Sequence, residues 1–432
     1  MSYLVVNGGK KLRGEITNQS AKNSAVAILC ASVMVKGRVV LSDVPKIEEV
    51  NRILELLVSI GVEVKNLGPG KLSLDTSKKL NLDSIDKRAS EITRSSLLLL
   101  GALASHQINY KLYKSGGCRL GERTVRPHLY ALESFGVSVV SKQKFYEVKN
   151  SPLHAAEIVM YESGDTPTEN AVMAAVLAPG KSIIRMASAN YMAQDLCYFL
   201  RQAGAKIEGI GTTTLTVEGV KNLKPVSNYS IMPDPIAAMT FLSAAIVTDS
   251  HLTITNCPMD FLDLELYKLE KIGQKLQIKN KKQDGPFRMA DIEVWPSKLK
   301  ALPDKIYGRP FPGLNIDNLP LFVPILAKAK GRTLVHDWAY ENRSVYYLEL
   351  QKLGVSITLL DLHRALVEGP TVFKPNEVVC PPALRPAVNV LICMLAAKGK
   401  SILRNTYVID RGYENLYNTL NKAGADIKII EK

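Results

Sequence analysis

The chain contains 432 residues, of which 46% are hydrophobic and 22% are charged, and its formal net charge is +14. It has no run of roughly 18 uninterrupted apolar residues, and its first residues lack the apolar core of a secretory signal, so we expect a cytoplasmic protein with no membrane partner. Lysine and arginine are spread along the whole chain without a nucleic-acid-binding motif, which argues against a nucleic acid as the partner.

One pattern recurs six times in chain order: an amphipathic helix, a glycine and a short alternating strand. The six glycines are Gly61, Gly136, Gly204, Gly273, Gly354 and Gly424. Their spacing of roughly 70 to 80 residues indicates one supersecondary unit repeated along the chain. Leucines three and four residues apart predict a buried face on each helix, and we expect glycine to end the helix because it tolerates the left-handed backbone conformation.

A second pattern precedes each copy of the first: a small apolar helix, a polar break and another strand. Its first copy spans residues 26–44 and its last spans residues 390–407. Six units of this size are too many for one hydrophobic core, so two domains of three units each are the natural partition. An open solenoid is the alternative, but its repeats would be unusually long and would need polar capping repeats.

The cysteines are those of a reduced protein with buried thiols. The six cysteines form no CxxC pair, and most of them lie in apolar runs. Cys118 is the exception, because it lies in a glycine-rich basic loop at residues 115–128 that also contains Arg119, Arg123, Arg126 and His128. Cationic neighbours increase the reactivity of a thiol, and such a loop could close over an anionic substrate. The alternative is an ordinary hairpin with a surface cysteine.

Three further segments place polar residues beside apolar helices. Lys22 and Asn23 precede the first apolar helix, where free N–H groups attract anions; a solvated lysine beside an asparagine cap is the alternative. Asp317 lies at the entrance to a helix, where it could simply cap the N-terminus. Arg411 follows Asp410 before the last helix and could bind a carboxylate or phosphate, or pair with Asp410.

Taken together, five motifs resemble those of the enolpyruvyl transferases along the whole chain. They are the opening segment that ends in Ala21-Lys22-Asn23, the Gly-Gly-Cys loop around Cys118, Thr168–Asn170, Tyr340–Arg343 and Asp410–Glu414. The Lys-Asn pair and the cysteine loop are similar to the UDP-N-acetylglucosamine 1-carboxyvinyltransferase branch of the family. The 3-phosphoshikimate branch typically has a Lys-Ser pair and lacks this cysteine loop.

The resemblance implies an α/β fold of two domains. Each domain would be an inside-out α/β barrel of three βαβαββ repeat units, giving six units in all. One domain would span residues 20–230 and contain the Cys118 loop, and the other would combine residues 1–19 with residues 231–432. The active site would lie in the cleft between the domains.

The resemblance also implies a transferase reaction. The enolpyruvyl group of phosphoenolpyruvate would pass to a hydroxyl of UDP-N-acetylglucosamine with release of phosphate, by addition and elimination, as in peptidoglycan precursor synthesis for the cell wall. The substrates would be phosphoenolpyruvate and a nucleotide sugar or nucleotide, with no metal and no other cofactor. Another nucleotide acceptor such as uridine monophosphate is an alternative, and a catalytically silent nucleotide-sugar-binding homologue is a second one.

The family's functional residues map onto this chain as follows. The catalytic residues would be Cys118, which protonates the methylene carbon and forms a covalent adduct with the donor, Asp317, which deprotonates the acceptor, and Lys22. Phosphoenolpyruvate would be bound by Lys22, Arg94, Arg123, Arg343, Arg385 and Arg411. The acceptor would be bound by Asn23, Arg123, Thr124, Val125, Arg126, Gly164, Asp165, Thr166, Asp317 and Tyr340. His128 and Glu341 would support the site, and fosfomycin-type epoxides would alkylate Cys118.

The departures from the family pattern gather on the acceptor side. Residues 124–128 read Thr-Val-Arg-Pro-His, so Arg126 replaces an acidic residue that would face the uracil. Residues 164–167 read Gly-Asp-Thr-Pro in place of Ser-Val-Gly-Ala, and residues 189–192 read Ala-Asn-Tyr-Met in place of Arg-Glu-Pro-Glu. Ala383 replaces an aspartate two residues before Arg385. One unpaired polar group costs about 1–3 kcal/mol, which is enough to redirect specificity.

Overall fold

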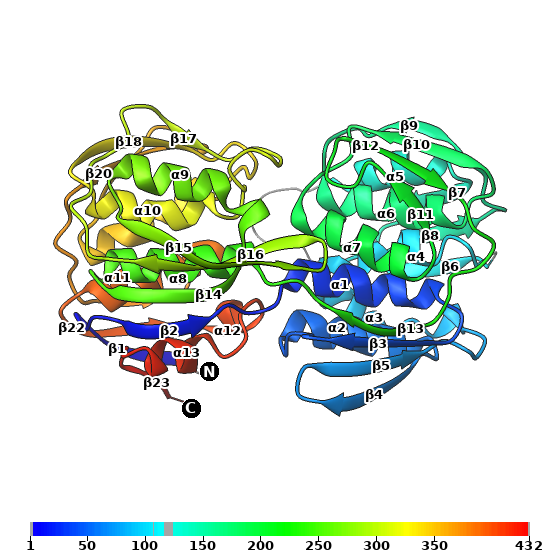
Figure 1. Ribbon diagram of the computed structural model, residues 1–432, viewed down its shortest axis with the longest axis horizontal. Helices are drawn as coiled ribbons and strands as arrows, with labels where there is room; N and C mark the ends of the chain where they lie inside the picture. The colour runs from blue at the N-terminus through cyan, green and yellow to red at the C-terminus, as the bar shows by residue number, and fades with distance from the viewer. Residues whose placement is uncertain (1–2, 107, 116–123, 431–432) are drawn as a thin grey trace. The chain divides into compact units, whose positions relative to one another are not determined.

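The computed structural model describes residues 3–106, 108–115 and 124–430 (Figure 1). Contacts within the described chain separate two compact units. The first unit comprises residues 20–115 and 124–232, and the second comprises residues 3–19 and 233–430. The chain therefore begins in the second unit, passes through the whole first unit, and then returns.

Helices and strands alternate along the first unit. Its helices are α1 (Lys22–Ala31), η1 (Ser32–Met34), α2 (Glu48–Ser59), η2 (Leu82–Ser84), α3 (Lys87–Ile92), η3 (Arg94–Leu98), α4 (Leu99–Ala102), α5 (Arg126–Glu133), α6 (Asp165–Val176) and α7 (Tyr191–Gln202). Its strands are β3 (Arg38–Ser42), β4 (Glu63–Gly68), β5 (Lys71–Asp75), β6 (Tyr110–Tyr113), β7 (Val137–Ser141), β8 (Phe145–Asn150), β9 (Glu157–Val159), β10 (Lys181–Arg185), β11 (Lys206–Glu208), β12 (Thr214–Glu218) and β13 (Val226–Ser230).

The second unit has the same alternation. Its helices are α8 (Pro235–Val247), η4 (Met259–Phe261), α9 (Asp263–Ile272), α10 (Leu319–Lys328), η5 (Ser344–Leu353), α11 (Leu384–Ala396), α12 (Tyr407–Asp410) and α13 (Leu416–Lys422). Its strands are β1 (Tyr3–Gly8), β2 (Arg13–Thr17), β14 (His251–Pro258), β15 (Leu276–Asp284), β16 (Phe287–Val294), β17 (Ile306–Tyr307), β18 (Gly331–His336), β19 (Ser356–Leu359), β20 (Arg364–Gly369), β21 (Glu377–Val379), β22 (Gly399–Arg404) and β23 (Ile427–Ile430).

Within the described residues, each unit contains three small sheets. Those of the first unit have the orders β13-β3-β5-β4, β6-β8-β7 and β11-β12-β10-β9, and those of the second have the orders β15-β16-β14-β2, β17-β18-β20-β19 and β21-β22-β1-β23. In the four-stranded sheets a parallel strand flanks one side of an inner strand and antiparallel strands follow on the other. Strand β10, for example, pairs parallel with β9 and antiparallel with β12. The fold is therefore of the mixed α/β type.

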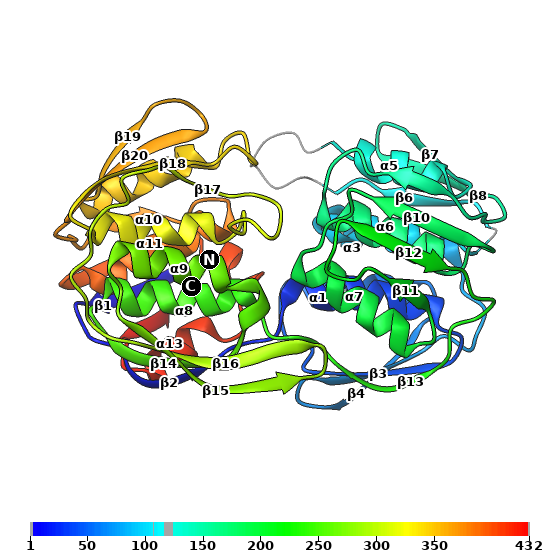
Figure 2. The same cartoon turned by 45° about the horizontal axis from the view of Figure 1, so that its top comes forward.

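The cores of both units are built from apolar helices. Every residue of α8 is buried, and α8, α10 and α11 pack on one another. α10 also lies beside β18 and β20 (Figure 2). Helices α1, α4 and α6 form the corresponding core of the first unit. Because other elements cover most of their sides, these helices have long apolar stretches, and the polar residues of α1, α6 and α11 lie mainly near their N-terminal ends.

The six repeated glycines have the backbone conformation that the sequence predicted. Gly61, Gly136, Gly204, Gly273, Gly354 and Gly424 have φ angles between +89° and +106°. This is the left-handed region, where a side chain is strained and glycine is not. The prediction that glycine ends each amphipathic helix is confirmed. The segment before Gly354 is a 3₁₀ helix, η5, where we expected an α-helix.

The N-terminal strands complete two sheets of the second unit. β1 pairs antiparallel with both β22 and β23, and β2 pairs parallel with β14. In this register Tyr3 lies opposite both Arg404 and Ile430. The first strand of the chain is therefore an inner strand between two of its last strands.

Candidate active site

Most of the predicted site residues lie within the described chain. Cys118 and Arg123 lie outside the described residues, so the roles that the sequence assigned to them stay predictions. The other residues fall into two groups, one in each unit, and each group forms a network of polar contacts.

In the first unit, His128 links the starts of α5 and α6. The Asn170 amide donates a hydrogen bond to Nδ1 of His128 over 2.8 Å, and Nε2 lies 3.4 Å from the hydroxyl of Thr166. Burial, together with the positive charge of Arg94, lowers the pKa of His128 to about 3. The imidazole is therefore neutral at physiological pH and supports this segment through hydrogen bonds rather than through charge.

Asn170 of the Thr-Glu-Asn motif holds three elements together. Besides His128, its amide donates to the carbonyl of Leu97, and its side-chain oxygen accepts the N–H of Gly101. Thr168 donates to the carbonyl of Gly164, the residue that caps α6. The motif therefore fixes the starts of α5 and α6. The predicted acceptor-binding residues Arg126 and Gly164–Thr166 lie at these two helix starts.

Asp165, at the start of α6, lies in a second polar network. Its carboxylate accepts hydrogen bonds from the Ser188 hydroxyl over 2.5 Å and from the Asn190 amide over 3.2 Å. Asn190 in turn caps α7 by accepting the N–H of Tyr191. Two of the segments that depart from the family pattern, residues 164–167 and 189–192, therefore contact each other.

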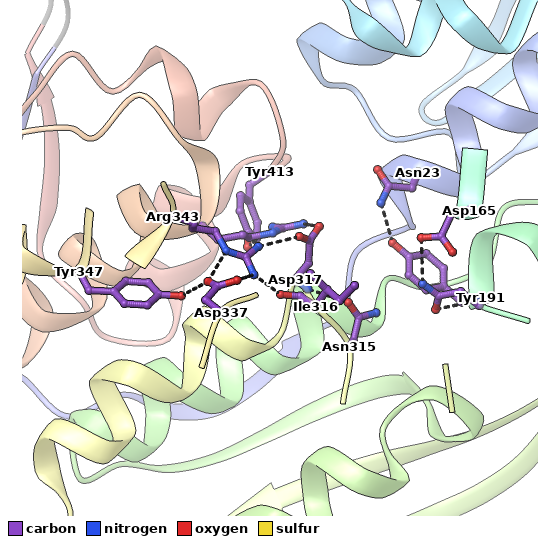
Figure 3. Close-up of polar contacts among 12 residues, drawn as sticks. Asn23, Asp165, Tyr191, Asn315, Ile316, Asp317, Asp337, Arg343, Tyr347 and Tyr413 are labelled. Carbon is purple, nitrogen blue, oxygen red and sulfur yellow. Dashed lines mark hydrogen bonds and ion pairs between the residues drawn. The ribbon is translucent and has the colours of Figure 1, made fainter. Parts of the chain in front are cut away.

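The Asn23 amide is held by a residue of the 189–192 segment to which the sequence assigned no role. Its nitrogen donates to the hydroxyl of Tyr191 over 3.0 Å, and the Tyr191 side chain is fully buried (Figure 3). Lys22 is the first residue of α1, and no side chain caps that helix. The structure thus brings the Lys-Asn pair of α1 next to the start of α7.

The segment that follows the cysteine loop contacts η3. The guanidinium of Arg94 donates to the carbonyl of Thr124 over 3.1 Å, and the Thr124 hydroxyl accepts the N–H of Arg126. The side chain of Arg126 is exposed at the first position of α5, while Val125 is partly buried. Arg126 is therefore accessible to a ligand at this helix terminus.

In the second unit, the carboxylate of Asp317 lies between two arginines (Figure 3). Its Oδ1 is 3.3 Å from Nη1 of Arg343, and its Oδ2 is 3.9 Å from Nη2 of Arg385. The Asp317 side chain is 29% exposed, whereas that of Arg343 is 1% exposed. The carboxylate of Asp317 is thus accessible to solvent, whereas the two arginines beside it are buried.

Arg343 is enclosed by acceptors. Its Nε and Nη2 donate to the two oxygens of Asp337 over 2.6 and 2.7 Å, and Nη2 also donates to the carbonyl of Ile316 over 2.7 Å. The hydroxyl of Tyr347 donates to Asp337 over 2.5 Å. Burial alone would lower the pKa of Arg343, but the Asp337 carboxylate and the nearby phenols raise it above the ordinary arginine value. The guanidinium therefore stays charged.

Buried carboxamide and carboxyl groups hold the loop that contains Asp317. Glu265 of α9 accepts the N–H of Asn315 over 3.1 Å and the side-chain amide of Asn318 over 2.8 Å. Burial raises the pKa of Glu265. Asn318 occupies the cap position of α10, and no side chain caps this helix. Asp317 therefore contacts the arginines without serving as the cap.

Arg385 is held by an aromatic residue of the Asp-Arg-Gly-Tyr-Glu motif. Its Nη1 donates to the hydroxyl of Tyr413 over 2.6 Å, and that hydroxyl lies 2.7 Å from the hydroxyl of Thr240. A Cβ on Gly412 would lie 2.3 Å from a methyl carbon of Leu384, the residue before Arg385. The glycine of the motif thus permits the turn to pack against the start of α11.

The remaining predicted residues of the second unit surround this cluster. The Cζ atom of Arg343 lies 4.3 Å from the ring centre of Tyr340, a cation–π distance. Glu341 is exposed, and Arg411 is partly buried directly after α12. The structure therefore brings Asp317, Tyr340, Arg343 and Arg385 together.

Sequence reasoning missed the residues that support the site. Asp337 binds Arg343, Tyr413 binds Arg385 and Tyr191 binds Asn23, although the sequence assigned no role to any of the three. Tyr347 binds Asp337, and Glu265 binds Asn315 and Asn318 beside Asp317. Asp337 follows β18 directly, in step with the buried positions Thr333 and Val335, and this was the available signal, since a buried carboxylate requires a partner. Among the described residues, no three His, Cys, Asp or Glu side chains are grouped so as to hold a metal ion. Nor does any described helix have the length and apolar character needed to cross a membrane.

Comparison with solved structures identifies the fold. The structure matches the enolpyruvyl transferase NikO from Streptomyces tendae with a TM-score of 0.87 and 23% sequence identity, covering 99% of both chains. It matches an EPSP synthase from Acinetobacter baumannii with a TM-score of 0.78 and 16% identity, covering all of both chains. Both solved structures therefore share the architecture of this chain.

Sequence comparison identifies the family. The chain is 32% identical over 441 residues to UDP-N-acetylglucosamine 1-carboxyvinyltransferase from Bacteroides fragilis, covering 100% of both proteins. It is 33% identical over 434 residues to the enzyme of the same name from Campylobacter hominis, covering 99% of both. The family profile for EPSP synthase (3-phosphoshikimate 1-carboxyvinyltransferase) matches residues 6–420. The chain therefore belongs to the EPSP synthase family and is an enolpyruvyl transferase.

Proposed function

We propose that this enzyme transfers the enolpyruvyl group of phosphoenolpyruvate to a hydroxyl of UDP-N-acetylglucosamine and releases phosphate. The observation that carries the proposal is the partly exposed Asp317 carboxylate, which lies beside Arg343 and Arg385 in a chain whose full-length relatives are named for this reaction. A carboxylate in this setting can accept the proton of an acceptor hydroxyl.

The reaction proceeds by addition and elimination. The acceptor oxygen forms a bond to the central carbon of phosphoenolpyruvate while Asp317 takes the hydroxyl proton. Cys118 gives a proton to the methylene carbon, so a tetrahedral intermediate forms. The bond from the central carbon to the phosphate oxygen then breaks, phosphate leaves, and loss of a methyl proton restores the double bond. The products are the enolpyruvyl ether and phosphate, so atoms and charge balance.

The donor requires several cations, because it carries a phosphate and a carboxylate. Lys22, Arg123 and Arg411 are assigned to it, with Arg94 and Arg385 contributing. The sequence also assigned Arg343 to the donor, but the structure encloses that guanidinium with Asp337, Ile316 and Asp317. The assignment of Arg343 to the donor stays a prediction.

The proposal implies a place in cell metabolism. An enzyme with this activity would be a cytoplasmic enzyme of peptidoglycan precursor synthesis and a target of fosfomycin. The reaction as written uses no metal and no other cofactor.

A second candidate is transfer to a different nucleotide acceptor, such as uridine monophosphate. Arg126 is exposed at the start of α5, where the UDP-sugar branch has an acidic residue. Asp165 and Asn190, which also depart from that branch, are bonded to each other nearby. A reversal of charge beside a base can change the preferred acceptor by leaving a polar group unpaired.

Phosphate release from phosphoenolpyruvate tests the proposal directly. The purified enzyme is incubated with UDP-N-acetylglucosamine, uridine monophosphate, shikimate 3-phosphate or no acceptor. Release with UDP-N-acetylglucosamine alone supports the proposal, and release only with another acceptor replaces it by the second candidate. In that second case, Arg126→Asp should restore some release with UDP-N-acetylglucosamine. An absence of phosphate release with every one of these acceptors contradicts both candidates.

Alkylation tests the donor side separately. The five described cysteines, Cys30, Cys197, Cys257, Cys380 and Cys393, are all buried. Fosfomycin should therefore add once to the intact protein, at Cys118, and should not add to the Cys118→Ala variant. That variant should keep its circular dichroism spectrum and lose turnover at neutral pH. Full activity in Cys118→Ala would contradict the role of Cys118 as the acid.

A further inference from the structure

We propose that Asp337 is a positioning residue that controls the basicity and orientation of Asp317 through Arg343. The inference rests on the proposed function, in which Asp317 is the base. Asp337 does not reach the substrate itself, because its side chain is 1% exposed and bound to Arg343 and Tyr347.

The contacts form a chain from a buried anion to the accessible one. Two N–H groups of Arg343 bind both oxygens of Asp337, a two-point contact that fixes the plane of the guanidinium. The same plane then directs Nη1 toward Oδ1 of Asp317 over 3.3 Å. Nη2 also binds the carbonyl of Ile316, the residue next to Asp317. Arg343 therefore contacts both the side chain and the backbone of the loop that presents the base.

The charges of the cluster explain why a base at this position needs Asp337. Arg343 and Arg385 both face Asp317, and two unbalanced cations would stabilise its carboxylate and make it a weak base. Asp337 balances one of them at 2.6 Å, closer than Asp317 does. In a buried setting such a partner strongly reduces the field of Arg343 at Asp317. Asp317 then keeps the affinity for a proton that the reaction requires.

The other polar groups near Asp317 contact one of the two arginines or the backbone of the Asp317 loop. The ring of Tyr340 lies against the guanidinium of Arg343, and the hydroxyl of Tyr413 accepts from Arg385. Glu265 holds the loop of Asp317 by accepting the N–H of Asn315 and the side-chain amide of Asn318, and burial raises its pKa. Asp337 is the carboxylate with a two-point contact to a guanidinium that faces Asp317.

The test replaces Asp337 by asparagine and follows the titration of Asp317 itself. Aspartate labelled with ¹³C at the carboxyl group is incorporated into the full chain, and the Asp317 signal is identified by its loss in Asp317→Asn. In Asp337→Asn the titration midpoint of Asp317 should fall by about one pH unit, because the charge of Arg343 is no longer balanced. The acid limb of the kcat profile should move to lower pH by the same amount, and kcat at pH 7 should fall about three- to tenfold.

A second variant tests whether the Asp317 midpoint can also be shifted upward, and a third serves as a control. Tyr347→Phe removes the hydroxyl that donates to Asp337. The carboxylate then opposes Arg343 more strongly, so the midpoint of Asp317 should rise by a few tenths of a pH unit. Glu55→Gln is the matched control, because it removes a carboxylate–arginine pair with the same 2.6 Å distance at an exposed position of the first unit. It should leave the Asp317 midpoint unchanged.

Opposite shifts in Asp337→Asn and Tyr347→Phe support the proposal, because a general loosening of the structure would move both variants in one direction. An unchanged Asp317 midpoint in a folded Asp337→Asn protein overturns it. If Asp337→Asn does not fold, an unchanged midpoint in Tyr347→Phe overturns it instead. The titration needs no substrate, so an inactive wild-type enzyme would reject the proposed function while leaving this test decisive.

Discussion

His128 contributes to the pH dependence of the stability of the first unit. Its folded-state pKa of about 3 lies below the value of about 6.5 for an unfolded histidine, because burial and Arg94 disfavour the charged form. Between these values the unfolded chain binds a proton that the folded chain does not. The contribution of His128 to stability is therefore complete above about pH 6.5 and is lost as the pH is lowered, by up to about 1.4 kcal/mol for each pH unit.

We expect His128→Gln to flatten this dependence. Urea unfolding measured at several values between pH 4.5 and 6.5 should show a slope smaller by about 1 kcal/mol per pH unit than in the wild type. The variant should also be less stable at pH 7, because the hydrogen bond from Asn170 is disturbed. His154→Gln is the control, since His154 is exposed. Equal slopes in wild type and His128→Gln would show that His128 is charged when folded.

At the scale of elements, α4 and α6 approach each other closely at Gly101. A Cβ on this residue would lie 2.5 Å from the backbone oxygen of Asn170 and 2.7 Å from its Cα. Because these are backbone atoms of a buried helix, they cannot move aside as a flexible side chain would. The same contact holds Asn170 in place for His128, so packing and site geometry depend on one glycine.

Gly101→Ala should therefore destabilise the protein by about 1–3 kcal/mol or more, as overpacking does. The loss is measured by urea unfolding at pH 7. Gly285→Ala is a useful comparison, because it has open space around its Cβ and a φ of +53°. That variant should lose about 1–2 kcal/mol from backbone strain alone. A Gly101→Ala protein as stable as the wild type would mean that α4 can shift away from α6.

The elements show what a single sequence can predict. Helix ends at Gly61 or Gly273 follow from local conformational preference, so they were visible in the residues themselves. The hydrogen bond from Asn23 to Tyr191 joins positions far apart in the chain, and no local pattern predicts it. The 3₁₀ geometry of η5 was also missed, because the spacing of its apolar residues fits an α-helix equally well.

The residues of the candidate site likewise divide into those that the sequence selected and those that only the structure revealed. The resemblance selected Asp317, Arg343 and Arg385, and the structure brings these three together. It did not select Asp337, whose importance depends on burial beside Arg343 and not on a motif. Roles that depend on bound substrates, including those of Lys22 and Arg411, stay predictions. So does the inside-out arrangement of six repeats, whereas the mixed α/β fold of the enolpyruvyl transferases is confirmed.

At the scale of the whole molecule, the two ends of the described chain are neighbours. β1 and β23 are antiparallel, with Tyr3 opposite Ile430, so a short turn could join them. A circular permutant that links residue 432 to residue 1 and opens the exposed turn between Gln143 and Lys144 should fold. Its circular dichroism spectrum and its rate of phosphate release should match those of the wild type.

A deletion of residues 1–8 provides the contrasting outcome. It removes an inner strand, so β23 loses its partner in this sheet and β22 keeps only β21, and the second unit should lose cooperative unfolding. Thermal unfolding followed by circular dichroism distinguishes the circular permutant from the deletion variant. A stable deletion variant would show that β1 contributes little to the sheet.

The position of β1 also determines how late in synthesis the second unit can finish folding. Leu4 and Val6 of β1 are buried, and they are made before α11, which packs on β1, and before the pairing strands β22 and β23. At about 5–20 residues per second, these apolar side chains wait roughly 20 to 80 seconds for their partners. The first unit, by contrast, has all its strands once residue 232 has emerged. Synthesis therefore proceeds past a complete first unit while β1 is still unpaired, and we expect a chaperone that binds nascent chains to bind at β1.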